Sequence, residues 1–376
     1  MRSARKLYIN GKFLVQRTTG VQRFARGMVG ALDKLLVHQA DISPPVLLTP
    51  PGATPLALEV IEQQTCGSAG LGATLWEQSV LPWAARDGVL LCLAGSAPLF
   101  GGTRIPTIHD AAIYLHPEAY SWRFIAWYRL LFARVSRAAP VIFTVSANAA
   151  RELAQQLPGR QFRVVPNAAE HMMSQAADST ILQKRQLAPG RYLLAVASQN
   201  PTKNLDTLIA AYRATGLGPD IALVLVGGAN SSVFAAGGGD ASLPGLLHAG
   251  TVSDAALRAL YENAAAFVFP SLYEGFGIPP LEAMSCGCPV LASNASSIPE
   301  VCGDAALYFD PRDPQAMAMA MRTLMAQPVL REALVAKGRE RQAQFSWSHS
   351  ARTMLAHLQA QGLLLPLPVS AARPAL

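Results

Sequence analysis

The sequence predicts an α/β protein of two Rossmann-like domains, each with a doubly wound parallel sheet, that face a cleft. The 376 residues exceed what one ordinary core needs, and this length favours two or three domains. Short apolar segments of strand propensity alternate with amphipathic helical segments from residue 6, and the alternation starts again at residue 192. In the second half, residues 267–284 read as a strand, a glycine turn and a helix. Two successive units of this kind predict two sheets with their ligand-binding edges toward the cleft.

Residues 267–284 organise the second half of the chain. Phe267 to Phe269 are apolar and of high strand propensity, whereas Gly275 and Gly277 allow the backbone to turn sharply and to approach a ligand closely. Pro279-Pro280 suits the first turn of a helix. Because open α/β sheets bind ligands at the carboxyl ends of their strands, we expect this turn to belong to a binding site.

Two carboxylates, Glu274 and Glu282, flank this turn. The first lies in the loop after the strand, and we expect the second in the first helical turn. N–H groups at a helix start favour an anion such as a diphosphate, while carboxylates accept hydrogen bonds from hydroxyl groups. A nucleotide sugar, with phosphates in its middle and a sugar at each end, satisfies both; a solvated helix face beside a turn is the plain alternative.

The spacing of these carboxylates resembles that of a known family. Glu274 and Glu282, within Glu-Gly-Phe-Gly-Ile-Pro-Pro-Leu-Glu-Ala-Met, are similar to the E-x7-E signature of retaining glycosyltransferases of family four. The match continues through residues 287–290 and 297–301, and the resemblance covers nearly the whole chain. It implies the GT-B fold and the transfer of a sugar from a nucleotide diphosphate donor to a carbohydrate hydroxyl with retention of anomeric configuration.

The resemblance also implies roles at the donor site. Glu282 would bind the ribose hydroxyls of the nucleotide, and Glu274, a catalytic candidate, would contact hydroxyls of the donor sugar and help to position the diphosphate. Lys203, in a loop similar to the family's phosphate-binding loop, is a second catalytic candidate that would stabilise the departing nucleotide. Further donor contacts fall on Gly20, Ser198, Val252, Gly275, Phe276, Gly277 and Ile278. Many relatives carry an arginine where this chain has Ser198, so neutralisation must depend on Lys203 and on helix N-termini.

Two further segments carry candidate residues in the first half. Residues 105–110 read as a strand that ends in His109 and Asp110, which places His109 at the ligand edge. The segment resembles the family's Thr-Ile-His-Asp, in which the histidine side chain or its backbone carbonyl lies near the reacting sugar, so His109 is a third catalytic candidate. Asp110 either contacts substrate or holds the loop. Trp76 and Glu77 resemble a segment of mannosyl- and rhamnosyltransferases and either pack the first domain or contact the acceptor.

The charge distribution favours an anionic partner of the first half. The net charge of +7 arises in residues 1–170, because the remainder holds equal numbers of basic and acidic residues. No nucleic-acid module and no basic stripe with interleaved aromatics is recognised, so we expect no nucleic acid. Residues 119–138 predict an amphipathic helix from which Arg123, Trp127, Arg134 and Arg137 project. These side chains either dock on an anionic membrane, with Trp127 at the interface, or are solvated.

Composition predicts a cytoplasmic location. Hydrophobic residues make up 51% of the chain, yet no run of about 18 apolar residues could span a bilayer, and the start lacks the apolar core of a signal peptide. Five cysteines are an odd, sparse set that suits reduced thiols. Cys286 and Cys288 have no second pair or nearby histidine to complete a zinc site. Membrane docking would add a peripheral position on the inner face of the cytoplasmic membrane.

We expect the chain to divide into four parts. Residues 1–170 form an acceptor domain and residues 171–345 a domain for the nucleotide-sugar donor. Residues 346–363 form a helix that crosses back to the first domain. Residues 364–376 carry prolines, which cannot continue a helix interior, and form an irregular tail.

Within the family, the pattern is most similar to mannosyl- and rhamnosyltransferases of bacterial polysaccharide assembly. This implies a nucleotide diphosphate sugar as donor, with GDP and mannose expected first and rhamnose next, and a glycan on a polyprenyl diphosphate carrier as acceptor. We find no Asp-x-Asp pair of the sort that holds a metal-bound diphosphate in the other large glycosyltransferase fold, so we expect no metal requirement and no cofactor. A nucleotide-sugar epimerase or hydrolase of the same fold and a non-catalytic scaffold of a polysaccharide assembly complex remain as alternatives. The presence of the three catalytic candidates and Glu282 argues against the scaffold.

Overall fold

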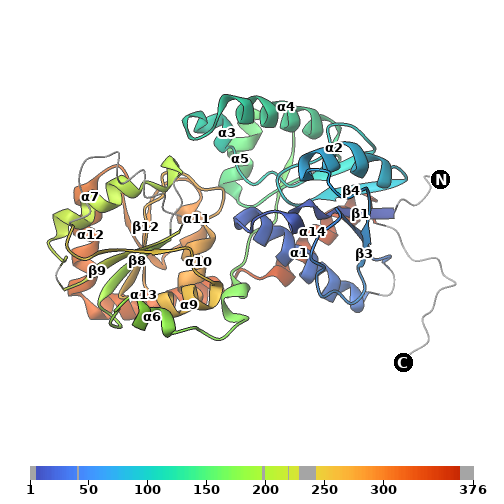
Figure 1. The fold of residues 1–376 in the computed structure, drawn as a ribbon. Helices are drawn as coiled ribbons and strands as arrows, with labels where there is room; N and C mark the ends of the chain where they lie inside the picture. The colour runs from blue at the N-terminus through green and yellow to red at the C-terminus, as the bar shows by residue number, and fades with distance from the viewer. Residues whose placement is uncertain (1–5, 40–41, 197–199, 219, 228–242, 365–376) are drawn as a thin grey trace. The chain divides into compact units, whose positions relative to one another are not determined.

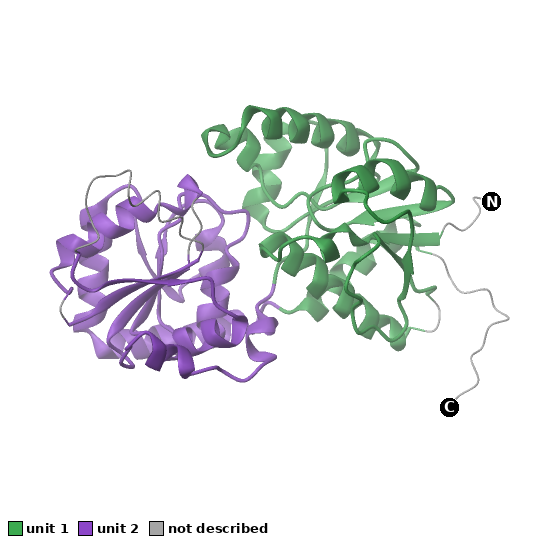
Figure 2. Ribbon diagram, in the orientation of Figure 1, with its two compact units in different colours: residues 1–167, 346–376 green, residues 168–345 purple. Residues whose placement is uncertain are grey.

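The computed structural model describes residues 6–39, 42–196, 200–218, 220–227 and 243–364. The chain forms two compact units (Figure 2). Unit 1 consists of Met1–Asn167 and Ser346–Leu376, and unit 2 consists of Ala168–Phe345. The first boundary follows Asn167, whereas residue 170 was the expected end of the first domain. The second boundary precedes Ser346, the residue at which we expect the helix that crosses back to the first domain to begin.

The core of unit 1 is a parallel sheet with the strand order β3-β2-β1-β4-β5 (Figure 1). A bridge from Thr107 to Phe143 connects this sheet to the parallel pair β6-β7. The strands are β1 (Lys6–Asn10), β2 (Val46–Thr49), β3 (Glu62–Thr65), β4 (Gly88–Cys92), β5 (Thr103–Pro106), β6 (Ile142–Thr144) and β7 (Phe162–Val164). From β1 the chain first adds β2 and β3 on one side and then β4 and β5 on the other. The carboxyl ends of β1 and β4 therefore form a topological switch point, where open α/β sheets bind ligands.

The helices of unit 1 are α1 (Gly20–Val37), α2 (Ala73–Ala84), α3 (Ala112–Leu115), α4 (Trp122–Ala138), α5 (Ala147–Gln156) and α14 (Trp347–Ala360), with the 3₁₀ turns η1 (Gly11–Val15) and η2 (Pro117–Ala119). Helix α14 packs on α1 although more than 300 residues separate them in the chain. Gly27 provides the close approach, because a Cβ atom there would lie 2.3 Å from Trp347 Cε2. Ser350 Oγ also donates a hydrogen bond of 2.7 Å to Pro166 O. These contacts explain why the last helix belongs to unit 1.

Unit 2 contains a parallel sheet with the order β10-β9-β8-β11-β12-β13. The strands are β8 (Tyr192–Val196), β9 (Ala222–Val226), β10 (Leu246–Gly250), β11 (Ala266–Phe269), β12 (Val290–Ser293) and β13 (Ala306–Phe309). The switch point of this sheet lies between β8 and β11. The segments that follow these two strands contain Lys203 and Glu274.

Helices cover both faces of the second sheet (Figure 1). They are α6 (Thr180–Lys184), α7 (Leu205–Thr215), α9 (Asp254–Asn263), α10 (Ile278–Ser285), α11 (Ile298–Cys302), α12 (Pro314–Ala326) and α13 (Pro328–Gln342), with the 3₁₀ turns η3 (Glu170–Met173) and η4 (Pro201–Lys203). Val268 packs with side chains of α7 and α12, whereas its neighbour Phe267 packs against Tyr261 of α9. Adjacent strand residues point to opposite faces, so β11 is buried on both and its whole sequence is apolar.

No helix among the described residues is both long and apolar enough to cross a membrane.

Candidate functional site

An ion pair occupies the switch point of unit 2. Lys203 Nζ lies 2.6 Å from Glu274 Oε1, and the side chains retain 26% and 14% of their exposure. Lys203 also lies over the ring of Phe269, the last residue of β11, at 5.9 Å from its centre. The pair is therefore partly open to solvent, and a ligand anion can reach the ammonium group. This contact joins two of the predicted catalytic residues.

The loop that carries Lys203 is held by its neighbours. Asn204 adopts a left-handed conformation with φ of 59°, and its Nδ2 donates to Pro270 O at 3.1 Å and to Pro311 O at 2.7 Å. Leu272 N donates to Thr202 O at 2.7 Å. These bonds fix the segment after β8 to the segments after β11 and β13, so the ion pair has a defined geometry.

Two serines support the loop that carries Glu274. Ser296 Oγ donates to Glu274 O at 2.7 Å, and Ser297 Oγ lies 2.9 Å from that oxygen and 3.0 Å from Phe276 O. Both serines lie just before α11, and Ser297 is the first residue of the segment 297–301 that resembles the family signature. Phe276 itself is buried and packs edge-on against Phe345 with ring centres 5.6 Å apart. Only its backbone can therefore contact a donor.

The start of α10 presents few N–H donors. Gly277 adopts φ of 100°, a conformation that favours glycine, and precedes Ile278, the first helical residue. Pro279 and Pro280 follow and have no N–H groups. Gly277 N and Ile278 N have no hydrogen-bond partner among the described residues. Gly275, in contrast, does not have a positive φ. Any anion at this helix start would depend on the first two amides.

Glu282 lies deeper in unit 2, in the second turn of α10 and not in the first turn as expected. Only 6% of its side chain is exposed. His171 Nε2, in η3, lies 2.8 Å from Glu282 Oε1, and the Tyr261 hydroxyl donates to Oε2 at 3.2 Å. Neither His171 nor Tyr261 was predicted from the sequence. No spacing signal connects them to Glu282, because His171 is 111 residues away in the chain.

His109 lies at the carboxyl end of β5 in unit 1, as predicted. Its Nε2 lies 2.9 Å from Leu93 O, and because a carbonyl oxygen only accepts, Nε2 carries the proton. The ring packs edge-on against Phe24 of α1, with ring centres 5.0 Å apart. Burial lowers the pKa of His109 to about 4. The imidazole is therefore neutral at physiological pH and has Nδ1 as its lone-pair nitrogen. Asp110 Oδ1 accepts from Ala112 N at 2.8 Å and so holds the loop.

Trp76 and Glu77 are core residues. Trp76 is fully buried and donates from Nε1 to Cys66 O at 2.8 Å. Glu77 is 1% exposed and accepts hydrogen bonds from Asn10 Nδ2 at 2.8 Å and from Lys12 Nζ at 2.7 Å. Neither side chain has a surface for an acceptor, so of the two roles left open by the sequence the structure supports packing.

The remaining donor candidates lie at separate positions. Val252 is half-buried after β10, at the same edge of the sheet as Lys203. Gly20 is the first residue of α1 in unit 1, after the capping residue Thr19, whose N–H donates to Gln22 Oε1 at 3.1 Å. Ser198 lies outside the described residues.

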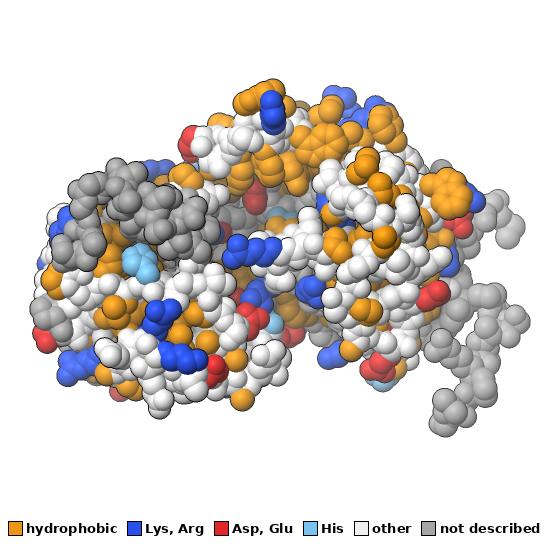
Figure 3. Space-filling view, in the orientation of Figure 1, with side chains coloured by type: hydrophobic (Ala, Val, Ile, Leu, Met, Phe, Trp, Pro, Cys, Tyr) orange, Lys and Arg blue, Asp and Glu red, His pale blue; other side chains and the backbone are white. Residues whose placement is uncertain are grey.

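Helix α4 exposes aromatic and basic side chains together. Arg123, Arg134 and Arg137 are exposed, but Trp127 is half-buried, and the exposed tryptophan is Trp122 at 72%. The Arg123 guanidinium lies 5.4 Å from the centre of the Trp122 ring. Figure 3 shows hydrophobic and basic side chains mixed over the part of unit 1 that α4 and α2 form.

The cysteines are ordinary thiols. Burial raises the pKa of Cys286 to about 12 and also raises that of Cys288. Within the described part of the chain, no group of three or more His, Cys, Asp or Glu side chains is arranged to hold a metal ion.

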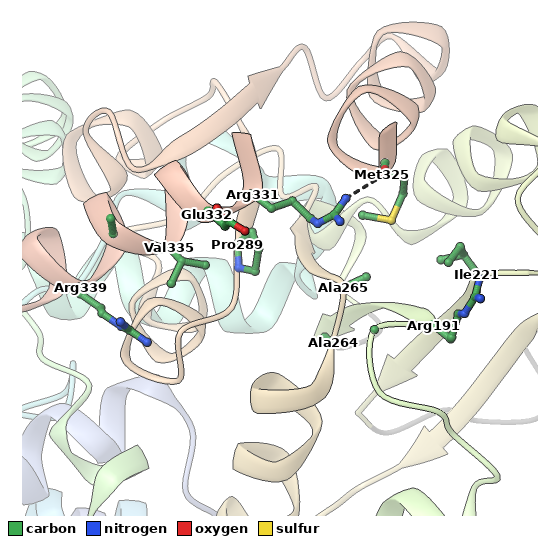
Figure 4. A pocket seen from close by; sticks show the side chains of 12 residues that line it. Arg191, Ile221, Ala264, Ala265, Pro289, Met325, Arg331, Glu332, Val335 and Arg339 are labelled. Atoms are coloured by element: carbon green, nitrogen blue, oxygen red, sulfur yellow. Dashed lines mark hydrogen bonds between the residues drawn. The ribbon is translucent and has the colours of Figure 1, made fainter. Parts of the chain in front are cut away.

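A cavity of about 720 Å³ lies at the opposite edge of the second sheet (Figure 4). Its walls include Arg191, Ile221, Ala265 and Pro289, which precede strands, and side chains of α13. Arg331 in this cavity donates to the carbonyls at the end of α12, with 2.8 Å to Leu324 O and to Met325 O. Because ligands of open α/β sheets bind at the carboxyl ends of strands, the candidate site is at the Lys203–Glu274 edge.

Comparisons with known proteins identify the family of the chain. Residues 179–341 match the family model described as glycosyl transferases group 1. The O-antigen chain mannosyltransferase B of Escherichia coli is 31% identical over 255 residues, which cover 65% of this chain and 67% of that protein. The serotype-specific mannosyltransferase WbdA of Escherichia coli is 32% identical over 265 residues, which cover 65% of this chain but only 32% of that longer protein.

Solved structures show the same fold at low sequence identity. A sucrose-phosphate synthase from Thermosynechococcus elongatus superposes with a TM-score of 0.72 at 18% identity, over 95% of this chain and 99% of that chain. WaaG, a glycosyltransferase involved in lipopolysaccharide biosynthesis, superposes with a TM-score of 0.66 at 16% identity, over 93% and 98% of the two chains. The chain is therefore a glycosyltransferase of the group 1 family and has the GT-B fold.

Proposed function

We propose that this glycosyltransferase transfers mannose from a nucleotide diphosphate sugar to a hydroxyl of a growing cell-surface glycan, with retention of anomeric configuration. The observation that carries the proposal is the Lys203–Glu274 pair at the switch point of unit 2. The similarity to the O-antigen mannosyltransferases of Escherichia coli favours mannose over rhamnose and a polysaccharide as product. GDP-mannose is the first donor to test.

In the proposed reaction, unit 2 binds the donor. The bond between the anomeric carbon and the diphosphate oxygen breaks, and the acceptor oxygen bonds to that carbon on the same face. The acceptor proton passes to the departing diphosphate. Lys203 would stabilise the negative charge that develops on this leaving group, while Glu274 would accept hydrogen bonds from the sugar hydroxyls.

We further propose that charge neutralisation uses protein groups and no divalent metal. Lys203 and the N–H groups of Gly277 and Ile278 supply the positive potential in unit 2. The prolines of α10 limit the number of these amides, which makes the lysine the dominant contribution. Turnover that persists in EDTA is the expected result, and turnover restored only by added magnesium or manganese would contradict this part of the proposal.

His109 is not suited to transfer a proton in this reaction. The low pKa keeps the imidazole neutral, and Leu93 O occupies its Nε2–H. We therefore propose that His109 acts near the donor sugar through its backbone carbonyl or as a neutral ring, and not as a general acid.

The first experiment is a screen of GDP-, UDP- and dTDP-sugars with a lipid-linked oligosaccharide mixture in the presence of EDTA. Acceptor-dependent release of one nucleotide, with an α-linked product from an α-linked donor by NMR, is expected. Inversion at the anomeric carbon would refute retention. Nucleotide release that does not depend on acceptor would indicate a hydrolase, and no donor binding would favour a scaffold.

The Lys203→Met variant then tests the site. Removal of one preorganised charge-stabilising group lowers kcat about 10²-fold or more. Lys184→Met is the matched control, because Lys184 is an exposed lysine of unit 2 on α6. Near-normal turnover of Lys203→Met would refute the role of the ion pair, whereas equal losses in both variants would point to a general effect on unit 2.

We also propose that unit 1 binds a polyprenyl-diphosphate-linked acceptor at an anionic membrane surface. The exposed arginines of α4 and the exposed Trp122 support this contact. A triple change of Arg123, Arg134 and Arg137 to Glu should abolish co-sedimentation with anionic liposomes. Unchanged co-sedimentation would discard the membrane contact but would leave the transferase activity in place.

A further inference from the structure

The carboxylate of Glu282 is held by two donors from other elements. Its side chain is 6% exposed, whereas the side chain of His171 is 19% exposed. His171 comes from η3, and Tyr261 comes from α9, and both elements pack against α10. The Tyr261 ring is fixed edge-on against Phe267 of β11. Three segments of unit 2 thus meet at one buried carboxylate.

The hydrogen-bond directions in this cluster follow from chemistry. Burial and the nearby Glu282 raise the pKa of Tyr261 well above its usual range, so its hydroxyl keeps its proton and donates. The carboxylate only accepts, so His171 Nε2 also carries a proton. Each carboxylate oxygen receives one donor and has a second lone pair. The two remaining lone pairs can accept the two hydroxyls of a vicinal diol.

We propose that His171 is a positioning residue that aims the Glu282 carboxylate at the ribose diol of the donor nucleotide. The proposal rests on the proposed function, in which Glu282 binds this ribose. Without His171, Oε1 loses the one side-chain donor that it has among the described residues, and the carboxylate can rotate about the remaining bond to Tyr261. His171 would then raise the affinity for a ribonucleotide without contact to the base or the phosphates.

The test compares nucleotides that differ only in one ribose hydroxyl. Calorimetry would measure the dissociation constants of GDP and 2′-deoxy-GDP, and of UDP and 2′-deoxy-UDP, for the full-length protein. The variants are His171→Phe, which removes the donor, His171→Gln, which replaces it, and Tyr261→Phe. His349→Gln is the matched control, since His349 is an exposed histidine of unit 1.

We expect the wild type to prefer the ribonucleotide. His171→Phe should weaken its binding about tenfold, which corresponds to ~1.4 kcal/mol, and should leave the deoxynucleotide unchanged. His171→Gln should restore most of the preference, because its amide can donate to the same oxygen. His349→Gln should bind like the wild type.

The outcomes separate this proposal from the proposed function. A wild type that binds ribo- and deoxynucleotides equally would overturn the ribose contact of Glu282 itself. A wild-type preference that persists in His171→Phe would overturn only the role of His171. Equal weakening of both nucleotides would show a merely structural effect, and tighter ribonucleotide binding would show that His171 competes with the ribose; both overturn the proposal. If His171→Phe does not fold, Tyr261→Phe is measured instead. Loss of the preference for the ribonucleotide in this variant would support the orientation of Glu282 by its hydrogen-bond donors, and an unchanged preference would overturn it.

Discussion

The buried Lys12–Glu77 pair allows a quantitative test of how unit 1 is stabilised. The two atoms lie 2.7 Å apart, and the side chains are 6% and 1% exposed. Asn10 Nδ2 and Ser96 Oγ also donate to Glu77 Oε1, at 2.8 Å and 2.7 Å. Glu77 thus connects the segments that follow β1 and β4, at the switch point of unit 1.

The two single substitutions should have unequal effects. Glu77→Gln leaves the Lys12 ammonium buried with neutral acceptors alone, among them Ser96 Oγ at 3.3 Å, and should lower the free energy of unfolding by about 3–5 kcal/mol. Lys12→Met leaves the carboxylate with Asn10 and Ser96 as donors and should cost about 1.5–3 kcal/mol. The double variant should be more stable than Glu77→Gln alone, because no unpaired ammonium remains.

The tryptophans provide a specific assay. All five tryptophans of the chain lie within the ranges of unit 1. Tryptophan fluorescence during denaturant unfolding therefore reports unit 1 without a contribution from unit 2. Glu62→Gln is the matched control, since Glu62 is exposed at the start of β3.

A loss below ~1 kcal/mol for Glu77→Gln would refute this reasoning, because that is the range of exposed ion pairs. A double variant that is less stable than Glu77→Gln would also refute it. In that case the neutral hydrogen bonds, and not the charge pair, would determine the stability of the cluster.

Two further predictions concern unit 1. Gly27→Ala places a Cβ atom 2.3 Å from Trp347 Cε2 and should destabilise unit 1 by about 1–3 kcal/mol. Gly30→Ala on the same helix is the control: its Cβ atom meets no atom within 4 Å, and the change should stabilise unit 1 by about 0.5–1 kcal/mol. Equal effects of the two variants in tryptophan-monitored unfolding would contradict the packing of α14. Burial lowers the pKa of His109 from 6.5 to about 4 in the folded state, so between these pH values the unfolded chain binds a proton that the folded chain does not. Stability should therefore be complete above pH 6.5 and fall by about 3 kcal/mol as the pH approaches 4, and His109→Gln should remove this part of the slope in unfolding measured across that range.

Much of the fold could be predicted from the sequence because its signals are local. The apolar run Phe267–Phe269, the turn at Gly277 and the helix that begins at Ile278 follow each other within a few residues. The strand-end position of His109 was also readable from the residues before it. Such features depend on backbone propensity and on hydrophobic period, which a sequence displays directly.

The partners of the candidate residues could not be predicted in the same way. His171 is 111 residues from Glu282, and a single residue in a sequence does not indicate which distant residue its side chain will contact. Glu77 appeared as a possible acceptor contact because its neighbours resemble a family segment, but the fold buries it against Lys12. Propensity also gave no reason to prefer Trp122 over Trp127 as the exposed aromatic of α4, since exposure depends on what packs beside the helix.

Each of the two units has a lysine–glutamate pair at the switch point of its sheet, although Glu77 belongs to α2 and Glu274 to the loop after β11. In each sheet a lysine after the first strand meets a glutamate at the switch point: Lys12 with Glu77 in unit 1 and Lys203 with Glu274 in unit 2. Burial distinguishes them, because the first pair is 6% and 1% exposed and the second is 26% and 14% exposed. A sealed pair cannot reach a ligand, and loss of one partner leaves a buried charge unpaired, whereas an open pair can exchange its partner for the charge of a ligand. We therefore expect substitutions of the first pair to change the stability of unit 1 and substitutions of the second pair to change turnover.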